Sequence, residues 1–569
     1  MKKSQSLIRL AIIAAILLTL NILAGYFNGR LDLTQEKRFT LTQPTVKEIK
    51  SLNDVVFVKV LLDGQFPAGF KRLQKSTLTM LQEFHHISHY LEYKFEDPSA
   101  GTTEEINARS KELAKEGIRP TRLNVKTGTE SSEKFIYPVA IFNYKNRSVY
   151  VNLLENETPG QNPEVTLNNS ISLLEYKCAN AISKLLTDDK PNIVFTEGHG
   201  ELTQEQTGDL EKTLRQYYDT GRLNLDSLVA IPYRDTANSK SADILIVAKP
   251  QTAFSEKDKF KLDQYVMNGG KVIWLIDKTT ASLEGMQATG EMLPLELPLN
   301  LDDIFFKYGF RLHSDLVVDM QCSHIPLKVG QVGGAPQMEL FPWYYFPIVA
   351  PASDHPVVKN LDRVNLQFPS SIDTIRTKTN IKKTILLASS ERSRLQLTPT
   401  KLNFEILRYK PEPDKFNKGN QPLAIMLEGP FSSNYENRVT AEMMQGLQQL
   451  HLEYKPLGID TKMMVVSDGD IARNEYDSQQ HTMSPLGYNR FDKYKFANKD
   501  FLINAVEYML DNNGIIEART KEVKLRLLDT VKADADANFW RGINIGLPLV
   551  LLGLFGWGYT WWRKRKYSS

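Results

Sequence analysis

Cysteine is scarce in this sequence, and several common catalytic motifs are missing. The 569 residues include two cysteines, Cys178 and Cys322, which excludes a disulfide framework and a zinc site built from cysteine alone. We expect both thiols to be unpaired because they fall in different predicted domains; a single bridge is the alternative. No G-x-x-x-x-G-K-[ST], G-x-G-x-x-G or G-x-S-x-G motif occurs. The sequence therefore offers neither a P-loop for nucleotide hydrolysis nor the serine elbow of a hydrolase.

An excess of one charge sign is also missing. Lysine and arginine total 70 and aspartate and glutamate total 67, and the net charge of +3 is no signature of nucleic-acid binding. Seven basic residues are confined to the two ends, so the part between them is slightly acidic. With 41% hydrophobic and 24% charged residues, the composition is globular and excludes a disordered chain or a polytopic membrane bundle.

Long hydrophobic runs are present at the two ends. Residues 10–27 carry no charge, and as a helix of roughly 27 Å they just span the hydrocarbon core. A cleaved signal peptide is the alternative. Residues 543–562 form a second uncharged run, with aromatic residues at its ends and four basic residues directly after it. Basic flanks tend to stay cytoplasmic, so we expect two membrane helices, both termini inside and residues 28–541 on the far side.

The second run also contains glycines at helical spacing. Small side chains such as Gly542 and Gly546 let a neighbouring membrane helix approach closely. We therefore consider a simple anchor and a helix that docks on another membrane protein as the two interpretations of this segment.

Between the two runs, the periodicity predicts an α/β protein with two αβ domains. The first covers residues 28–187, and its strands, helices and one hairpin are expected at 54–62, 70–90, 93–97, 103–116, 135–153 and 168–186. The second covers residues 188–515, with an insertion at about 279–420. Residues 1–27 and 542–569 hold the two membrane segments, and residues 516–541 are juxtamembrane.

Continuous apolar strands alternate with helices in the second domain. Strands are expected at 192–196, 243–248, 271–277, 423–427 and 462–467, and helices at 202–217, 255–267 and 500–510. This alternation predicts a parallel sheet covered on both faces.

Two groups of polar residues follow predicted strands, where open α/β sheets bind ligands. In the first, Glu197, His199 and Glu201 are separated by two glycines, so one imidazole lies between two carboxylates. Such a turn could contact a ligand, perform acid–base chemistry or hold a metal. The alternative is a structural turn whose glycines permit the bend and whose carboxylates cap the next helix.

The second group consists of Asp277, Asp468 and Asp470, which also follow predicted strands. These carboxylates are expected to converge on the same crevice as the first group, unless they only form turns and caps. His85 and His89 share a helix face, but no third metal ligand is evident, so we expect solvated or half-buried histidines. The aromatic residues at 341–347 are expected to form a core strand, with an exposed platform as the alternative.

A series of short motifs resembles one known family. It includes residues 30–34 and 38–42 after the first hydrophobic run, the turn at 197–201, the Gly269-Gly270 turn and residues 465–470. Their order, together with both terminal runs, is similar to the ABC-transporter auxiliary proteins of gliding bacteria. Residues 188–512 also resemble class I glutamine-amidotransferase folds. That chemistry needs a nucleophilic cysteine on an elbow, and none follows the strand that ends at Asp277.

The resemblance implies an inner-membrane protein with a periplasmic bulk, which supports gliding motility and works with a separate permease and a separate ATPase. We expect it to bind a ligand or a partner protein without being an enzyme and without a cofactor or metal. Two alternatives stay open: a structural adaptor to the cell envelope, or an amidotransferase-like enzyme acting at Glu197, His199 and Glu201.

Overall fold

The structure, a computed structural model, divides the chain into two compact units, Met1–Glu522 and Val523–Ser569. The parts of the chain that it describes are residues 12–19, 40–127, 130–155, 163–187, 189–228, 230–232, 241–332, 335–409, 411–449, 453–477, 479–480, 482–520, 532 and 535–567.

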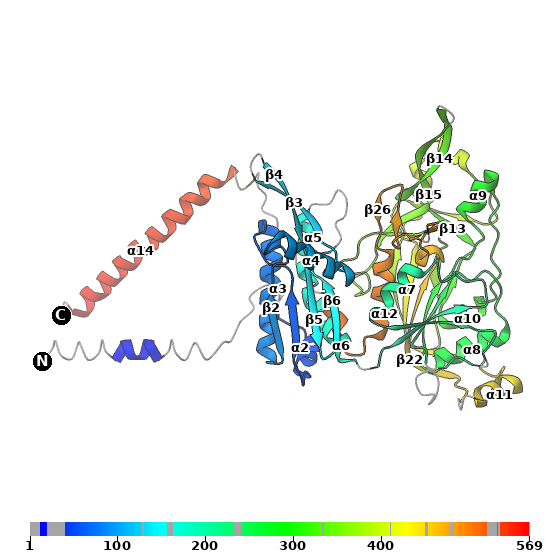
Figure 1. Ribbon diagram of the computed structural model, residues 1–569, viewed down its shortest axis with the longest axis horizontal. Helices are drawn as coiled ribbons and strands as arrows, with labels where there is room; N and C mark the ends of the chain where they lie inside the picture. The colour runs from blue at the N-terminus through cyan, green and yellow to red at the C-terminus, as the bar shows by residue number, and fades with distance from the viewer. Residues whose placement is uncertain are drawn as a thin grey trace. The chain divides into compact units, whose positions relative to one another are not determined.

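The first half of the larger unit is built on a four-stranded sheet (Figure 1). Its strand order is β2 (Leu91–Phe95), β1 (Val56–Val60), β5 (Val139–Tyr144) and β6 (Arg147–Asn152). Strand β1 runs parallel to β2 and antiparallel to β5, which forms the expected hairpin with β6. Its apolar core joins the sheet to the helices α2 (Gln43–Lys50), α3 (Ala68–Ile87), α5 (Pro163–Ser172) and α6 (Leu174–Leu186).

Two local features of this half differ from the expected elements. The helix expected over 168–186 is two helices, because α5 ends before Leu173 and α6 begins after it. Strands β3 (Thr121–Thr127) and β4 (Glu130–Ile136) form an additional hairpin. Helix α4 (Thr103–Lys115) begins with a capping box in which Thr102 and Glu105 bond each other's backbone.

The second half is built on a ten-stranded mixed sheet (Figure 1). Five strands run parallel, namely β8 (Asp219–Asn224), β7 (Asn192–Glu197), β9 (Ile244–Ala248), β10 (Lys271–Leu275) and β22 (Leu457–Val466). The sheet then continues antiparallel through β21 (Pro422–Ser432), β18 (Lys382–Ala388), β15 (Ala335–Pro351) and β14 (Cys322–Val332), and β16 (Val364–Asn365) pairs with β15. The expectation of a parallel sheet is therefore correct for half of it.

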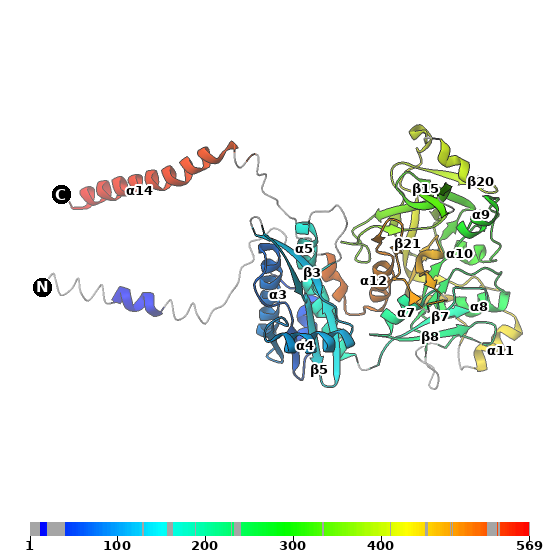
Figure 2. The same cartoon turned by 45° about the horizontal axis from the view of Figure 1, so that its top comes forward.

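Helices cover both faces of this sheet, as the unbroken apolar strands predict (Figure 2). Alternate residues of each parallel strand enter opposite cores; Ile193 and Phe195 belong to one core and Val194 to the other. The first core includes α7 (Gly208–Leu214) and α12 (Asn498–Leu510), and the second includes α8 (Glu256–Met267) and α10 (Asp302–Tyr308).

The segment expected as an insertion, residues 279–420, contributes four strands to the main sheet, β14, β15, β16 and β18. Its remaining strands form small antiparallel pairs, such as β13 (Asp315–Asp319) with β19 (Ser393–Leu397). The aromatic run within β15 is buried, with Trp343 at 0% and Tyr345 at 2% exposure. The run is therefore a core strand, as predicted, and not an exposed platform.

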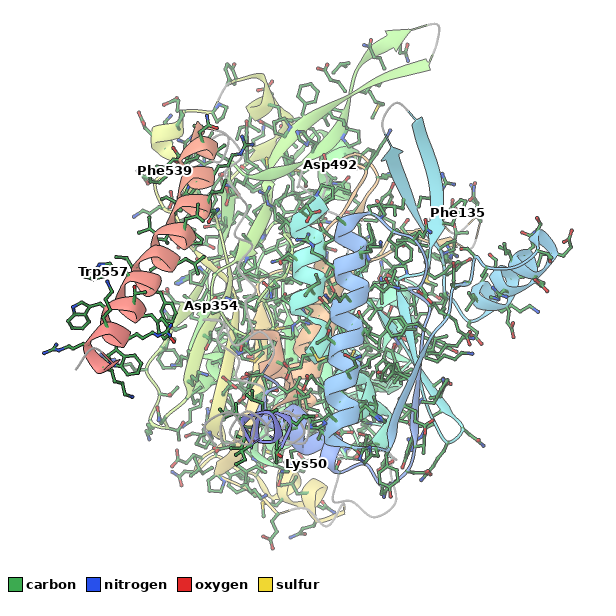
Figure 3. The ribbon with its side chains drawn as sticks, turned by 90° about the vertical axis from the view of Figure 1, so that its left-hand side faces the viewer. Lys50, Phe135, Asp354, Asp492, Phe539 and Trp557 are labelled. Atoms are coloured by element: carbon green, nitrogen blue, oxygen red, sulfur yellow. The ribbon has the colours of Figure 1, made fainter. Side chains whose placement is uncertain are left out.

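The smaller unit contains helix α14 (Ala537–Tyr567). Within the described part of the chain it is the one helix long and apolar enough to cross a membrane, and none of its most apolar stretch is buried. Phe539 and Trp557 project from it (Figure 3). Of the first hydrophobic run only residues 12–19 are described, as helix, so the span expected there lies mostly outside the described residues. Both cysteines are unpaired.

The first and last described stretches of the αβ body, which begin at residue 40 and end at residue 520, meet next to helix α6. Near one end, Thr42 donates its backbone N–H to Glu175 of α6 at 2.6 Å. Near the other, η4 (Ile515–Thr520) packs its isoleucines against Tyr176 of α6. The two ends also touch each other, since Asn513 Nδ2 lies 3.3 Å from Glu48 Oε2. The chain therefore enters and leaves the body at one place.

Candidate functional site

Three adjacent parallel strands place charged residues at one edge of the main sheet. Lys249 follows β9, Asp277 lies two residues beyond β10, and Asp468 and Asp470 follow β22. These strands lie side by side in the order β22, β10, β9, and their carboxyl ends point the same way. The convergence predicted for the three aspartates is confirmed, because one carboxylate oxygen from each lies within 4.8 Å of the others.

Internal contacts hold this aspartate cluster in place. Asp277 Oδ1 accepts the backbone N–H of Gly469 at 2.6 Å, and Asp468 Oδ1 accepts that of Asp470 at 2.8 Å. Lys249 Nζ lies 3.3 Å from Asp277 Oδ2 and also bonds Asp470. Lys249 therefore pairs with two of the three carboxylates and neutralises part of their charge.

Burial controls the protonation of the cluster. It raises the pKa of Asp277 to about 6, with the nearby Asp470 carboxylate adding to the effect and Lys249 opposing it. Burial also raises the pKa of Asp468 well above its usual value, again with Asp470 and Asp277 contributing. The pKa of Lys249 is raised although burial opposes this, because Asp277 and Asp470 favour its charged form. Lys249 is thus cationic at neutral pH.

A polar cleft of about 790 Å³ opens beside the cluster. Asp470 lines the cleft, whereas Asp277 and Asp468 lie behind it. Arg473 connects the aspartate cluster to the cleft wall. Its guanidinium lies 3.3 Å from Asp470 and 3.1 Å from Glu284, which also lines the cleft. The charged residues of its wall are of both signs, namely Glu205, Glu284, Asp470, Arg473, Glu475 and Arg490. A cleft of this size and composition suits a polar ligand or a polar segment of a partner.

The turn at 197–201 has the contacts of a structural turn. Its two glycines have positive φ, +114° for Gly198 and +75° for Gly200. The backbone N–H of His199 donates to Glu201 Oε2 at 2.7 Å, and its carbonyl accepts from Gln251 at 2.7 Å. Glu197 bonds Arg222 at 2.8 Å. The glycines thus form the turn, as the structural alternative proposed, but the carboxylates stabilise the turn itself and do not cap the following helix, α7.

The His199 side chain is sealed inside the protein. It is 3% exposed and stacks on Phe254, with ring centroids 3.8 Å apart. Its Nε2 lies 3.5 Å from Asp258 Oδ2, but Asp258 also binds Lys261 at 2.8 Å and Ser255 at 2.6 Å. None of the three turn residues lines the cleft. The structure therefore does not bring the turn and the aspartates into one crevice, because the 249–252 loop lies between them.

The other sequence candidates do not form sites among the described residues. The His85 and His89 rings contact each other edge to face at 5.4 Å, and His85 Nδ1 bonds the Leu91 carbonyl at 2.7 Å. Gly542 and Gly546 face open space on α14. Their docking role stays a prediction.

Sequence reasoning missed the basic residue that pairs with each group of carboxylates. Lys249 pairs with the aspartates, and Arg222 pairs with Glu197 of the turn. Lys249 comes directly after a strand, so the argument that selected the aspartates applied equally to it. Arg222 carries no such signal, because it lies within the polar strand β8.

Comparisons with known proteins place this geometry in context. The model of a family described as an ABC-type uncharacterized transport system matches residues 190–505, and that of a domain of unknown function matches residues 35–143. An uncharacterized protein of Borreliella burgdorferi is 22% identical over 418 residues, which cover 72% of this chain and 74% of that protein. The solved mmIFT52 N-terminal domain is 11% identical, with a TM-score of 0.30, over 56% of this chain and 98% of its own.

Proposed function

Because this chain belongs to the family of ABC-type uncharacterized transport systems, we propose that it is a non-catalytic, membrane-anchored auxiliary component of an ABC-type transporter. The observation that carries the proposal is helix α14, which is apolar, unburied and long enough to span a bilayer. The chain lacks a P-loop, so a separate ATPase would supply the energy and a separate permease the path.

The proposed setting is the inner membrane of a gliding bacterium, with both termini cytoplasmic and the body in the periplasm. Support comes from the junction beside α6, where Glu48 and Asn513 touch, because two membrane segments could then leave the body from one side. Basic residues 563–566 at the end of α14 favour a cytoplasmic C-terminus.

Copurification from membranes tests the docking role of α14. At about 100° per residue, Gly542 and Gly546 lie on one face of the helix and Gly558 on nearly the opposite face. We expect Gly542→Leu/Gly546→Leu to reduce recovery of a multi-span permease at least several-fold, because leucine side chains block close helix approach. The matched control is Gly558→Leu, which should leave recovery unchanged. Equal recovery of the permease with the parent protein, the double variant and the Gly558→Leu control would contradict a docking role for this helix face.

We assign ligand or partner binding to the cleft of about 790 Å³ beside the aspartate cluster, which we call the sheet-edge cleft. Glu284→Ala/Arg473→Ala removes the charged bridge across the cleft without touching α14. Copurification with the permease should persist while the motility or transport phenotype is lost. An unchanged phenotype would instead favour a structural adaptor, since such a protein needs the anchor but not the cleft.

A further inference from the structure

A second cavity, of about 390 Å³, lies between the two αβ halves of the body. Strand β6 and helices α5 and α6 line it from the first half, and α12, η4 and residues 360–362 line it from the second. It shares no lining residue with the sheet-edge cleft. Ligand pockets are common at domain interfaces and reach this volume.

Four of the charged groups on this wall form two ion pairs. Lys184 Nζ lies 2.5 Å from Glu507 Oε1, and Lys177 bonds Glu155. Tyr176 and Asn180 also donate to Glu507. These pairs are complete within the protein, so they create no need for a ligand.

Three other groups on the same wall are incomplete. Arg519 is 7% exposed, forms no ion pair with any described residue, and its Nε has no hydrogen-bond partner among them. Its other nitrogens donate to the Asn504 side chain at 2.8 Å and the Lys359 carbonyl at 3.5 Å, and the guanidinium lies 5.0 Å from the centre of the Tyr176 ring. The buried Nδ2 of Asn360 also lacks a partner. The third is Asp500, whose carboxyl makes no hydrogen bond or ion pair with any described residue and whose pKa is raised, chiefly by burial.

The two unpartnered donors are costly, because a buried donor forfeits its hydration without compensation, whereas Asp500 is half-buried. The cavity wall thus offers N–H donors from Arg519 and Asn360 together with a carboxylate from Asp500. A molecule that carries both a carboxylate and an ammonium group complements all three. We propose that the cavity between the two αβ halves binds a small zwitterion of the amino-acid class, with its carboxylate at Arg519 and Asn360 and its ammonium at Asp500.

Calorimetric titration of the full-length protein in detergent tests this proposal. The probes are glycine and L-alanine, and the controls are acetate and methylammonium, which each carry one of the two charges. We expect saturable binding of at least one zwitterion and at least tenfold weaker binding of both acetate and methylammonium. Binding should also raise the melting temperature of the protein, because a ligand of the native state stabilises it.

Two substitutions probe opposite ends of the ligand. Asp500→Asn removes the negative charge that would face the ammonium group. Asn360→Gly removes the donor while permitting the positive φ of +57° at this position. Each should weaken zwitterion binding at least tenfold. Asp362→Asn is the matched control, because Asp362 lines the same cavity but is already bonded by Tyr494.

The outcomes separate the proposal from its rivals. If no probe saturates, the cavity holds only water and the proposal fails. Acetate that binds as tightly as L-alanine would contradict the role of Asp500. Binding that survives both Asp500→Asn and Asn360→Gly, with melting temperatures like that of the parent protein, would place the ligand elsewhere. These results are independent of permease copurification, which tests the proposed function.

Discussion

At the scale of single residues, His199 is the group whose sequence context and structural role differ most. Its position between two carboxylates indicated chemistry, whereas its ring is stacked on Phe254 inside the protein. We expect His199→Ala to lower the free energy of unfolding by about 2–4 kcal/mol, because it leaves a cavity and removes the stack. Thermal unfolding measures this loss. Copurification and motility should survive at a permissive temperature; if they fail while the fold is intact, His199 has a functional role.

The aspartate cluster predicts a specific pH dependence of stability. Burial raises the pKa of Asp277 from 3.8 to about 6, so between these values the folded state binds more protons than the unfolded state. Stability from this group is therefore present at low pH and lost as pH rises through about 6. Relative to the parent protein, Asp277→Asn should gain about 3 kcal/mol between pH 4 and pH 8. Chemical unfolding across this range measures the gain, and the exposed Asp414→Asn should show none.

The aspartates were predictable because a position after an apolar strand can be read from the sequence. Lys249 obeys the same rule, but a lysine at a strand end is an ordinary surface residue unless the carboxylates beside it are known. The burial of His199 could not be predicted, because Phe254 and Asp258 reach it only through the order of the strands.

At the scale of elements, the contact between α6 and α12 joins the two αβ halves. Lys184 of α6 and Glu507 of α12 are paired, with side chains 14% and 10% exposed. We expect Glu507→Gln to cost about 3–5 kcal/mol, because it leaves the lysine unpaired in a desolvated site. Native-state hydrogen exchange should show α6 amides opening at least a hundredfold faster.

A matched substitution distinguishes this buried pair from a surface one. Glu412 pairs with Lys415, and both side chains are more than half exposed, at 69% and 61%. Glu412→Gln should therefore change stability by about 1 kcal/mol or less. Similar effects of the two substitutions would mean that the α6–α12 pair is solvated.

Elements with strong apolar periodicity were predicted well, whereas the polar strand at the edge of the main sheet was not. The buried strands β7, β9 and β10 agree with the expected ranges within two residues at each end. The helix expected over 202–217 is shorter, α7, and the strand β8 that follows was missed. Strand β8 is an edge strand with polar residues at most positions, so neither alternation nor an apolar run marks it.

At the scale of the whole molecule, the scarcity of cysteine makes the topology testable. Burial raises the pKa of both Cys178 and Cys322 to about 12, so neither native thiol should react with maleimide at neutral pH. In intact spheroplasts, Asn146→Cys on the β5–β6 turn should react with a membrane-impermeant maleimide, and Tyr567→Cys only after lysis. The reverse pattern would place the body in the cytoplasm.

The antiparallel half of the main sheet could not be predicted from local sequence. The direction of a strand relative to its neighbour depends on the connection between them. Residues 433–456 connect β21 to β22, which pairs antiparallel with β21. Within residues 322–388 the sequence predicts one core strand, at 341–347, but not that this part of the chain extends a sheet begun at Asn192. The resemblance to amidotransferase folds, which rests on the parallel half, stays a prediction.

The contact between Glu48 and Asn513 makes the body a self-contained module. The first and last described stretches of the body are neighbours, so a short linker could join them and a new opening could be cut at the exposed β5–β6 turn. Such a circular permutant would keep every strand pairing except the hairpin at the cut. Because its two ends are close together, the body could also be inserted into the loop of an unrelated helical hairpin without stretching either connecting segment.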